Sequence, residues 1–451
     1  GEWGYGIAVT GGSGITIRDV TVRDCWGDGI NVQRLDGTLA RSLVTSDLRI
    51  DNVTCADNRR QGMSLEGVIG ANVTASTFTG TSGTAPSAGV DIEPWEAGTP
   101  SEDIVFHGCS FTDNDSSGLL ILGDGVRGVT ADGCLFSGNG DSEAQVKSYT
   151  DGGQGIRILN SRIVAGAGGE DCIRLQGGSG NLVAGNHVNG RIYLIDGPDD
   201  AIRKTTVRDN TAVYDATPGQ PSYWLACVAG EDVTFAGNRI DATGDQSTAS
   251  KHGVYVASST RVTIVGNSIA GVTRGISVTD SSTYVDILDN ALDNNGTYAV
   301  GLTGVADCLL SRNTIAGACG DNDSSPSVYM TSGASGVRVI DNLFIKEPRL
   351  SGASAGRVWY VISGWNTGVL QDLVTRGNRV VGSGMVLTVP AAYLGAALTT
   401  GYAGDERGLM CDTTGQRPTT PATGTAYYDT TLNKHITFNG TVWKDGSDTT
   451  V

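Results

Sequence analysis

A short alternating pattern recurs along most of the chain, at intervals of 23 to 36 residues. Each copy has a five-residue stretch of alternating apolar and polar residues, a corner of one or two residues and a second short strand, as in VTIVGNSI (262–269). Alternation with period two is typical of β-strands, and a repeat length in the twenties is typical of solenoids. The L-x-x-L-x-L frame of leucine-rich repeats is absent. The sequence therefore predicts an all-β fold, a right-handed parallel β-helix of about 14 coils followed by a small C-terminal β-module.

One corner position recurs in every copy of the pattern. Its occupants are Val20, Val53, Ser76, Cys109, Cys134, Ser161, Asn186, Asn210, Asn238, Asn267, Asn290, Asn313, Asn342 and Asn378. Eight successive asparagines predict a stacked amide ladder, in which each side chain hydrogen-bonds the next and the asparagine tolerates the left-handed turn conformation. Because Cys109 and Cys134 occupy the same position, we interpret them as packing residues rather than nucleophiles.

Composition restricts the classes of protein that remain. Glycine makes up 66 of the 451 residues, without the Gly-X-Y period of collagen. The formal net charge of −17 argues against nucleic acid or an anionic membrane surface as the main partner. No apolar run is long enough to span a bilayer, so no membrane insertion is expected. The nine cysteines include no C-x-x-C pair, which indicates neither a disulfide framework nor a zinc site.

A change in composition after the repeats divides the chain into three parts. Residues 1–390 are predicted to form the β-helix, 391–414 a connector and 415–451 a small aromatic β-module, in which Asn439-Gly440 is a turn signal. The first residues, GEWGYGIAV, already fit a coil, whereas a β-helix end is normally capped. We therefore expect an N-terminally truncated β-helix, cut from a longer chain.

The tail carries the most specific motif of the sequence, GQRPTTPATGTAYYDTTLNKHITFNGTVWKDG (415–446). It resembles the short C-terminal module of many bacteriophage tailspike and tail-fibre proteins. The residues that fit the frame of that module are Arg417, Tyr428, Asp429, Leu432, Asn439, Gly440, Trp443 and Asp445. CADNRRQGMSLEGV (55–68) and GTAPSAGVDIEP (83–94) resemble a segment common in pectate-lyase-like β-helix proteins, many of them from phages.

The resemblance implies a homotrimeric tailspike, a polysaccharide depolymerase that binds and cleaves a bacterial surface polysaccharide, either capsule or O-antigen. It also implies attachment to the phage virion through a missing N-terminal region, assembly in the host cytoplasm and action outside the cell, at the host surface. The C-terminal module would serve trimerisation or form the tail tip. Members of this group include hydrolases and lyases, so the reaction type stays open. A non-catalytic glycan-binding adhesin of the same fold is the alternative, and no cofactor is expected.

Candidate site residues follow from stacking the strand after each glycine-rich corner on its equivalent in the next coil. Equivalent positions lie about 4.8 Å apart, and residues i and i+2 share a face. The second and fourth positions are Ile, Val or Leu and are predicted to point inward, so the third and fifth point outward. The third positions are Ala8, Asn31, Ser64, Asp91, Leu120, Arg174, Tyr193 and Tyr255, and the fifth are Thr10, Gln33, Glu66, Glu93, Leu122, Gln176, Ile195 and Ala257. The segment 143–148 is irregular and takes no place in this register.

Three carboxyl groups are predicted to gather on the third and fourth coils. Asp91 and Glu93 are outward on one strand, about 6.5–7 Å apart at the backbone, and Glu66 lies about 5 Å from Glu93 by the coil spacing. Carboxylates this close raise the pKa of one of them, which glycoside hydrolysis needs in order to pair an acid with a base. Asp91, Glu93 and Glu66 are therefore the candidate catalytic residues. Both retaining and inverting geometries fit these spacings, and a solvated surface or plain sugar contacts are the alternatives.

Polar and aromatic residues around these carboxyls are candidate substrate contacts. They are Asn31, Gln33, Arg59, Arg60, Gln61, Arg174, Trp26 and Trp95. An arginine can clamp a sugar carboxylate or neutralise Glu66 and Glu93, and tryptophan can stack on a pyranose face. Asp171 with Arg174 forms a second candidate centre, whereas Asp28 is interpreted as a turn former. The four histidines are scattered without ligand spacing, so no metal site is predicted.

Overall fold

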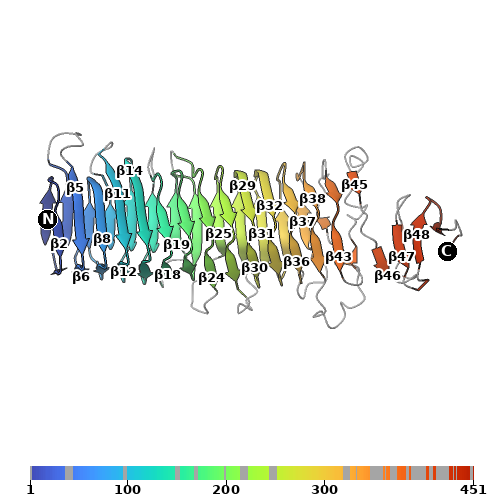
Figure 1. The fold of residues 1–451 in the computed structure, drawn as a ribbon, viewed down its shortest axis with the longest axis horizontal. Coiled ribbons are helices and arrows are strands. Elements are labelled where there is room, and N and C mark those ends of the chain that lie inside the picture. Colours follow the sequence, from blue (N-terminus) through green and yellow to red (C-terminus); the bar gives the residue numbers. More distant parts are fainter. Residues whose placement is uncertain are drawn as a thin grey trace. The chain divides into compact units, whose positions relative to one another are not determined.

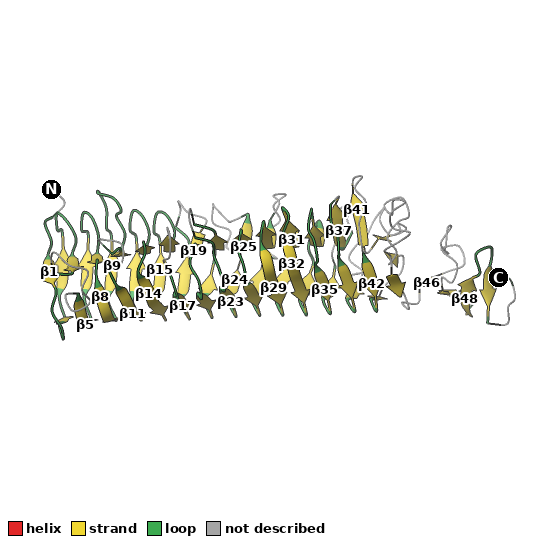
Figure 2. Cartoon of the chain, turned by 90° about the horizontal axis from the view of Figure 1, so that it is seen from above, coloured by secondary structure: helices red, strands yellow, loops and turns green. Residues whose placement is uncertain are grey.

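The predicted parallel β-helix with a small C-terminal β-sheet is confirmed by a computed structural model of the chain. The structure describes residues 3–35, 44–94, 99–147, 153–166, 171–197, 200–213, 222–242, 251–317, 326–331, 333–345, 359–360, 362–365, 373–381, 385–386, 403–405, 410–412, 426–429, 431–432, 434–446 and 450. These residues form strands and no helix (Figure 2). The chain divides into two compact units, Gly1–Asn267 and Ser268–Val451, which are described in turn.

The first unit is built from three parallel sheets, and every coil contributes one strand to each of them in turn (Figure 1). Sheet A contains β1 (Ile7–Thr10), β4 (Ile30–Gln33), β7 (Met63–Leu65), β10 (Val90–Ile92), β13 (Leu119–Leu122), β16 (Ala144–Lys147), β19 (Asp171–Gln176), β22 (Arg191–Ile195), β25 (Tyr223–Val228) and β28 (His252–Ala257). Sheet B contains β2 (Thr16–Arg18), β5 (Thr45–Asp51), β8 (Val68–Thr74), β11 (Ser101–His107), β14 (Val126–Asp132), β17 (Arg157–Leu159), β20 (Leu182–Ala184), β23 (Thr206–Arg208), β26 (Thr234–Ala236) and β29 (Thr260–Val265). Sheet C contains β3 (Thr21–Arg23), β6 (Thr54–Ala56), β9 (Thr77–Thr79), β12 (Ser110–Thr112), β15 (Leu135–Ser137), β18 (Arg162–Val164), β21 (His187–Val188), β24 (Thr211–Val213) and β27 (Arg239–Asp241).

The second unit repeats the coil and ends in the C-terminal sheet. Its coil strands are β30 (Ser268–Ala270), β31 (Arg274–Thr279), β32 (Thr283–Leu288), β33 (Ala291–Asp293), β34 (Tyr298–Leu302), β35 (Leu309–Ser311), β36 (Thr314–Ala316), β37 (Val328–Thr331), β38 (Arg338–Ile340), β39 (Leu343–Ile345), β41 (Ile362–Trp365), β42 (Val374–Arg376), β43 (Arg379–Val381) and β45 (Ala403–Asp405), and β40 (Trp359–Tyr360) pairs with β44 (Met385–Val386). The C-terminal sheet contains β46 (Met410–Asp412), β47 (Ala426–Asp429), β48 (Lys434–Phe438) and β49 (Trp443–Asp445). The predicted boundaries at residues 390 and 414 lie outside the described residues.

The C-terminal sheet has a small core of its own. β48 pairs in antiparallel fashion with β47 and β49, and Ile436 and Trp443 are buried together with Phe438 against them. Between β48 and β49, the side-chain Oδ1 of Asn439 accepts hydrogen bonds from the backbone N–H groups of Thr441 and Val442. The Asn-Gly turn expected from the sequence thus joins two strands.

Identical residue types stack from coil to coil inside the first unit. Phe78 of β9, Phe111 of β12 and Phe136 of β15 are buried at equivalent positions. Their ring centroids lie 5.5 and 4.6 Å apart, with nearly parallel planes. Because each coil buries the same side of its strands, alternation in the sequence becomes a continuous apolar column.

The asparagine ladder is also present, with one correction. Asn186, Asn210 and Asn238 are buried, and the Nδ2 of each donates at 3.0 Å to the Oδ1 of the asparagine in the next coil. The predicted left-handed conformation does not fall on the asparagines, however. It falls on the residue before each of them, as at Asp209 (φ 55°) and Gly237 (φ 62°). The asparagine can therefore aim its amide inward, because its neighbour makes the turn.

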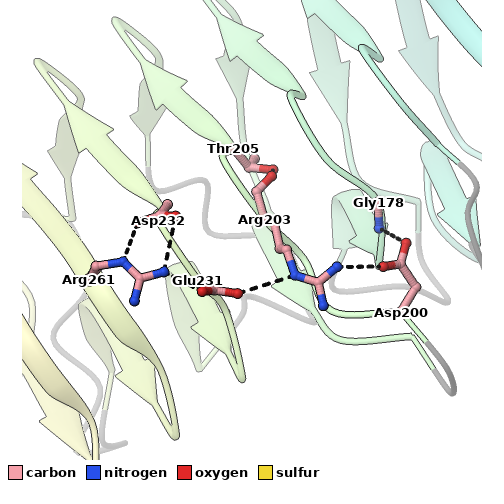
Figure 3. Close-up of polar contacts among 7 residues, drawn as sticks. All are labelled: Gly178, Asp200, Arg203, Thr205, Glu231, Asp232 and Arg261. Atoms are coloured by element: carbon pink, nitrogen blue, oxygen red, sulfur yellow. Dashed lines mark hydrogen bonds and ion pairs between the residues drawn. The ribbon is translucent and has the colours of Figure 1, made fainter.

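A second ladder, of alternating charges, lies at a corner before sheet B (Figure 3). Arg261 donates from Nε to Asp232 Oδ1 at 2.6 Å and also pairs with Glu231. Arg203 joins Glu231 to Asp200 with two contacts of 3.2 Å, and Asp200 accepts from the backbone N–H of Gly178. The Arg261 hydrogen bonds lower the pKa values of Glu231 and Asp232. These groups are largely solvent-exposed, so they contribute little to stability.

Candidate functional site

The strand register places the candidate residues as the stacking predicted. Asn31 of β4 lies opposite Ser64 of β7, which lies opposite Asp91 of β10. The column continues through Leu120, Gln145, Arg174, Tyr193, Ala226 and Tyr255. Gln145 fills the coil that the sequence left without a register, and Ala226 belongs to a coil that the stacking omitted. All of these residues are therefore on sheet A.

The expectation that this column is open on the outside is wrong for its first half. Asn31, Ser64, Asp91, Leu120 and Gln145 point away from the apolar core, yet all five are buried. The reason lies in the corner residues before the strands. Their polar side chains fold over the column and contact it, so the site is a buried polar cluster and not a solvated strand face.

Asp28 is the centre of this cluster. Its Oδ2 accepts hydrogen bonds from Asn31 Nδ2 at 3.1 Å and from Ser64 Oγ at 2.9 Å. Both of its oxygens lie 3.2–3.3 Å from one terminal nitrogen of Arg60. Asn31 Nδ2 also donates to Glu66 Oε1 at 3.1 Å. A fully buried carboxylate with three donors holds the neighbouring side chains in fixed orientations.

Asp91 is held separately, by Gln61. The Gln61 amide is fixed because its Oε1 accepts from the backbone N–H of Ala88 at 2.9 Å, and its Nε2 then donates to Asp91 Oδ2 at 2.9 Å. The other oxygen of Asp91, Oδ1, is buried without a hydrogen-bond partner, as is Oδ1 of Asn31. Two orphaned oxygens on alternate strands are a local cost that a bound donor would remove.

The carboxyl groups of the cluster differ in how strongly they hold a proton. Burial raises the pKa of Glu66 to about 6. Burial, and then the charge of Glu93, raise the pKa of Asp91 well above its ordinary value. Burial also raises the pKa of Asp28, against the opposing effect of Arg60 and the two neutral donors. Asp91 therefore holds its proton more tightly than an ordinary aspartate, beside other ionisable carboxyl groups.

The remaining candidate residues form the rim of the cluster. Glu93 directly follows β10 and is exposed, and its backbone N–H donates to Leu65 O, which places it beside Glu66 on the next coil. Gln33 donates to the Tyr5 hydroxyl at 3.4 Å. Trp26 is 60% exposed, with the Arg59 guanidinium carbon 4.4 Å from its ring centroid. Trp95 lies outside the described residues.

Sequence reasoning missed two members of the cluster. Asp28 was assigned to turn formation, and Ser64 was placed in the column without a role. A stacking of the residues directly before the corner glycines would have found Asp28. Gly29 N–H pairs with Gln61 O, so Asp28 and Gln61 are equivalent residues of successive coils, and both bond to the column beside them.

The second candidate centre is a separate group on the same sheet. Asp171 is buried and hydrogen-bonds Arg191 of β22, and its Oδ2 lies 3.9 Å from a terminal nitrogen of Arg174. The guanidinium carbons of Arg174 and Arg191 lie 5.7 and 4.5 Å from the ring centroid of Tyr193. One acid with two bases gives this group a net positive charge, so it lacks the second carboxyl that hydrolysis by a carboxyl pair needs.

Metal sites and membrane-spanning helices can be assessed for the part of the chain that the structure describes. Within them, no group of three or more His, Cys, Asp and Glu side chains is arranged to hold a metal ion. They also include no helix suited to crossing a membrane.

Comparison with protein families identifies the fold. The family described as "right handed beta helix region" matches residues 1–99 and 97–269, more than half of the chain. The chain belongs to the right-handed β-helix family. A second family, described as "periplasmic copper-binding protein (NosD)", matches residues 220–346. Comparison with curated proteins gives no match.

Solved structures of other proteins share the β-helix fold. A mannuronic acid specific polysaccharide family 6 lyase from human gut microbiota is 13% identical, over 88% of this chain and 86% of its own, with a TM-score of 0.51. Tailspike protein 3 of bacteriophage CBA120 is 14% identical, over 90% of this chain and 64% of its own, with a TM-score of 0.48. The Dettilon tailspike protein is 17% identical, over 66% and 63%, with a TM-score of 0.42. The chain thus spans less than two thirds of either tailspike.

Proposed function

We propose that this protein is a phage tailspike that binds and depolymerises a bacterial surface polysaccharide, capsule or O-antigen, by glycoside hydrolysis. The observation that carries the proposal is the buried cluster on β4, β7 and β10, where Asp91, with a raised pKa, lies close to other carboxyl groups. The lyase that shares the fold supports polysaccharide as the substrate class. The tail motif, which resembles phage tail modules, supports the tailspike assignment.

In the proposed reaction, Asp91, which is buried in the free protein, is the general acid once the bound sugar displaces the side chains that cover it. Gln61 orients its carboxyl group, and the proton passes to the glycosidic oxygen as the bond to the sugar breaks. The charge that develops on the sugar ring is stabilised by Glu66 or by the exposed Glu93, which acts either on the anomeric carbon or through a water. Asp28 and Arg60 are positioning residues, because they act through Asn31 and Ser64.

The test is product analysis on a panel of purified capsular and O-antigen polysaccharides. We expect wild type to release oligosaccharides, and both Asp91→Asn and Glu66→Gln to lose at least about 100-fold in rate while still binding the polymer. Asp293→Asn, which changes an exposed aspartate of β33, is the matched control and should cleave at the wild-type rate. Wild-type rates in Asp91→Asn would contradict the assignment.

The same assay separates the alternatives. A lyase of this fold leaves an unsaturated uronate at the new end, which absorbs in the ultraviolet, whereas hydrolysis leaves a saturated reducing end. A wild-type protein that binds a polysaccharide and releases no product would be an adhesin. The proposal further includes a homotrimer in the virion tail, attached through a region N-terminal to this sequence and acting at the host surface.

A further inference from the structure

The charge of the outward side chains of sheet A changes from negative to positive along the sheet. On β4, β7 and β10 the outward positions are Asn31, Gln33, Ser64, Glu66, Asp91 and Glu93, so every charge there is negative. On β16, β19 and β22 they are Gln145, Lys147, Arg174, Gln176, Tyr193 and Ile195, whose charged members are both positive. Asp171, at the start of β19, is bonded to Arg191. Between the two ends, β13 contributes Leu120 and Leu122. A positive end in a chain of net charge −17 is a local feature that composition does not explain.

The positive end also has hydrogen-bond donors without acceptors. Nε of Arg174 and Nε2 of Gln145 are buried and unpartnered, and these residues are opposite each other on neighbouring strands. The ion pair of Arg174 with Asp171, at 3.9 Å, exceeds hydrogen-bond length, and Asp171 is already bonded to Arg191. Unpartnered donors are thus found at this end of the face, whereas the unpartnered atoms at the other end are the oxygens of Asn31 and Asp91.

Arg174 can be reached by a ligand. Its side chain is 31% exposed, whereas that of Asp171 is only 8% exposed. The ring of Tyr193, half-buried on the next strand, has the guanidinium carbons of Arg174 and Arg191 at 5.7 and 4.5 Å from its centroid, and the rest of its apolar surface is of the kind on which sugars stack. A partly exposed guanidinium recognises a planar anion by paired hydrogen bonds, and a carboxylate is the acidic group that sugars most simply carry.

From these observations we infer that the exposed part of the Arg174 side chain, with Tyr193, forms a subsite for the carboxylate of an acidic sugar. This inference rests on the proposed function and narrows its substrate class to polysaccharides that contain uronic or other carboxylated sugars. Three strand spacings, about 14 Å, separate the subsite from Asp91 along the face. The carboxylate is thereby held away from the acidic end, where it would be repelled, while another part of the same chain reaches Asp91.

The experiment compares binding to acidic bacterial polysaccharides with binding to the carboxyl-reduced derivative of each. Wild type should bind an acidic polymer about 10- to 100-fold more tightly than its reduced form. Arg174→Gln should abolish that preference, and Arg174→Lys should keep part of it. The matched control is Arg208→Gln, which removes an exposed arginine of sheet B and should leave the preference unchanged.

Two results would overturn the inference. Equal binding of acidic and reduced polymers by wild type would exclude a carboxylate subsite while leaving the depolymerase proposal intact. A loss in Arg174→Gln no greater than in Arg208→Gln would exclude Arg174 as its anchor. If no polysaccharide is bound or cleaved at all, the proposed function fails together with the inference. This outcome can be distinguished from the other two, because in both of those the protein still binds polysaccharide.

Discussion

The chemistry of single residues in the site depends on which neighbours each carboxyl group has. Glu66 and Asp91 could be placed from the sequence, because strand register alone decides which residues stack. Asp28 could not, because it precedes its strand, and the direction of a corner side chain depends on the conformation of the corner. For the same reason the sequence could not predict that Arg60 and Gln61 turn toward the column and bury it.

The raised pKa of Glu66 predicts a specific dependence of stability on pH. Folding moves this pKa from 4.5 to about 6, so the folded state binds the proton more tightly. The contribution is fully present below pH 4.5 and is lost as the pH rises through 6. Relative to Glu66→Gln, wild type should therefore lose about 1–2 kcal/mol of unfolding free energy across this range.

Urea unfolding at several pH values measures this difference. Asp28 and Asp91 are present in both proteins, so the difference between the two curves arises from the loss of Glu66 and of its effect on Asp91. The control Asp293→Asn should follow the wild-type curve, because its side chain is exposed. Parallel curves for wild type and Glu66→Gln would mean that Glu66 is not buried as described.

At the scale of structural elements, hydrogen-bond ladders keep successive coils in register. Asn238 donates to Val207 O at 2.9 Å and to Asn267 Oδ1 at 3.0 Å, and its own Oδ1 accepts from the backbone and side chain of Asn210. The recurrence of asparagine made this ladder predictable. The position of the left-handed turn was not predictable. The residue with positive φ is the one before each asparagine, and its type varies between Asp, Gly and Arg.

Removal of one rung should therefore destabilise the coil strongly. Asn238→Ala removes the hydrogen bonds of the Asn238 side chain to Val207 O and Asn267 and the two that it accepts from Asn210, and we expect a loss of at least about 3 kcal/mol. The neighbouring substitution Arg239→Ala, on the exposed side of β27, is the control and should change stability by about 0.5 kcal/mol or less. Chemical denaturation of both variants gives the comparison, and equal stability would contradict a structural role for the ladder.

At the scale of the whole molecule, the fold was predictable because one periodicity runs through the repeats. Alternation identified the strands, and the corner residues gave the coil length. The irregular coil containing Gln145 was not predictable, because no glycine precedes its strand and the alternation there is short. The change from negative to positive charge along sheet A could therefore be described only from the structure, which places Gln145 between Leu120 and Arg174.

The proposed trimer makes a prediction about mass in solution. Light scattering during size-exclusion chromatography should give three times the chain mass of 46.5 kDa. The trimer is proposed because the tail resembles phage tail modules. Removal of residues 415–451 should therefore lower the mass or broaden its distribution. A homogeneous 46.5 kDa species from the full chain would contradict the trimer.

The most direct test of the account is a crystal structure of Asp91→Asn bound to an oligosaccharide from the polysaccharide that wild type cleaves. The account predicts a chain of sugars along sheet A, with a glycosidic oxygen within hydrogen-bond distance of the residue 91 side chain and a carboxylate against Arg174. Ordered sugar on sheet B or sheet C, with sheet A empty, would contradict it.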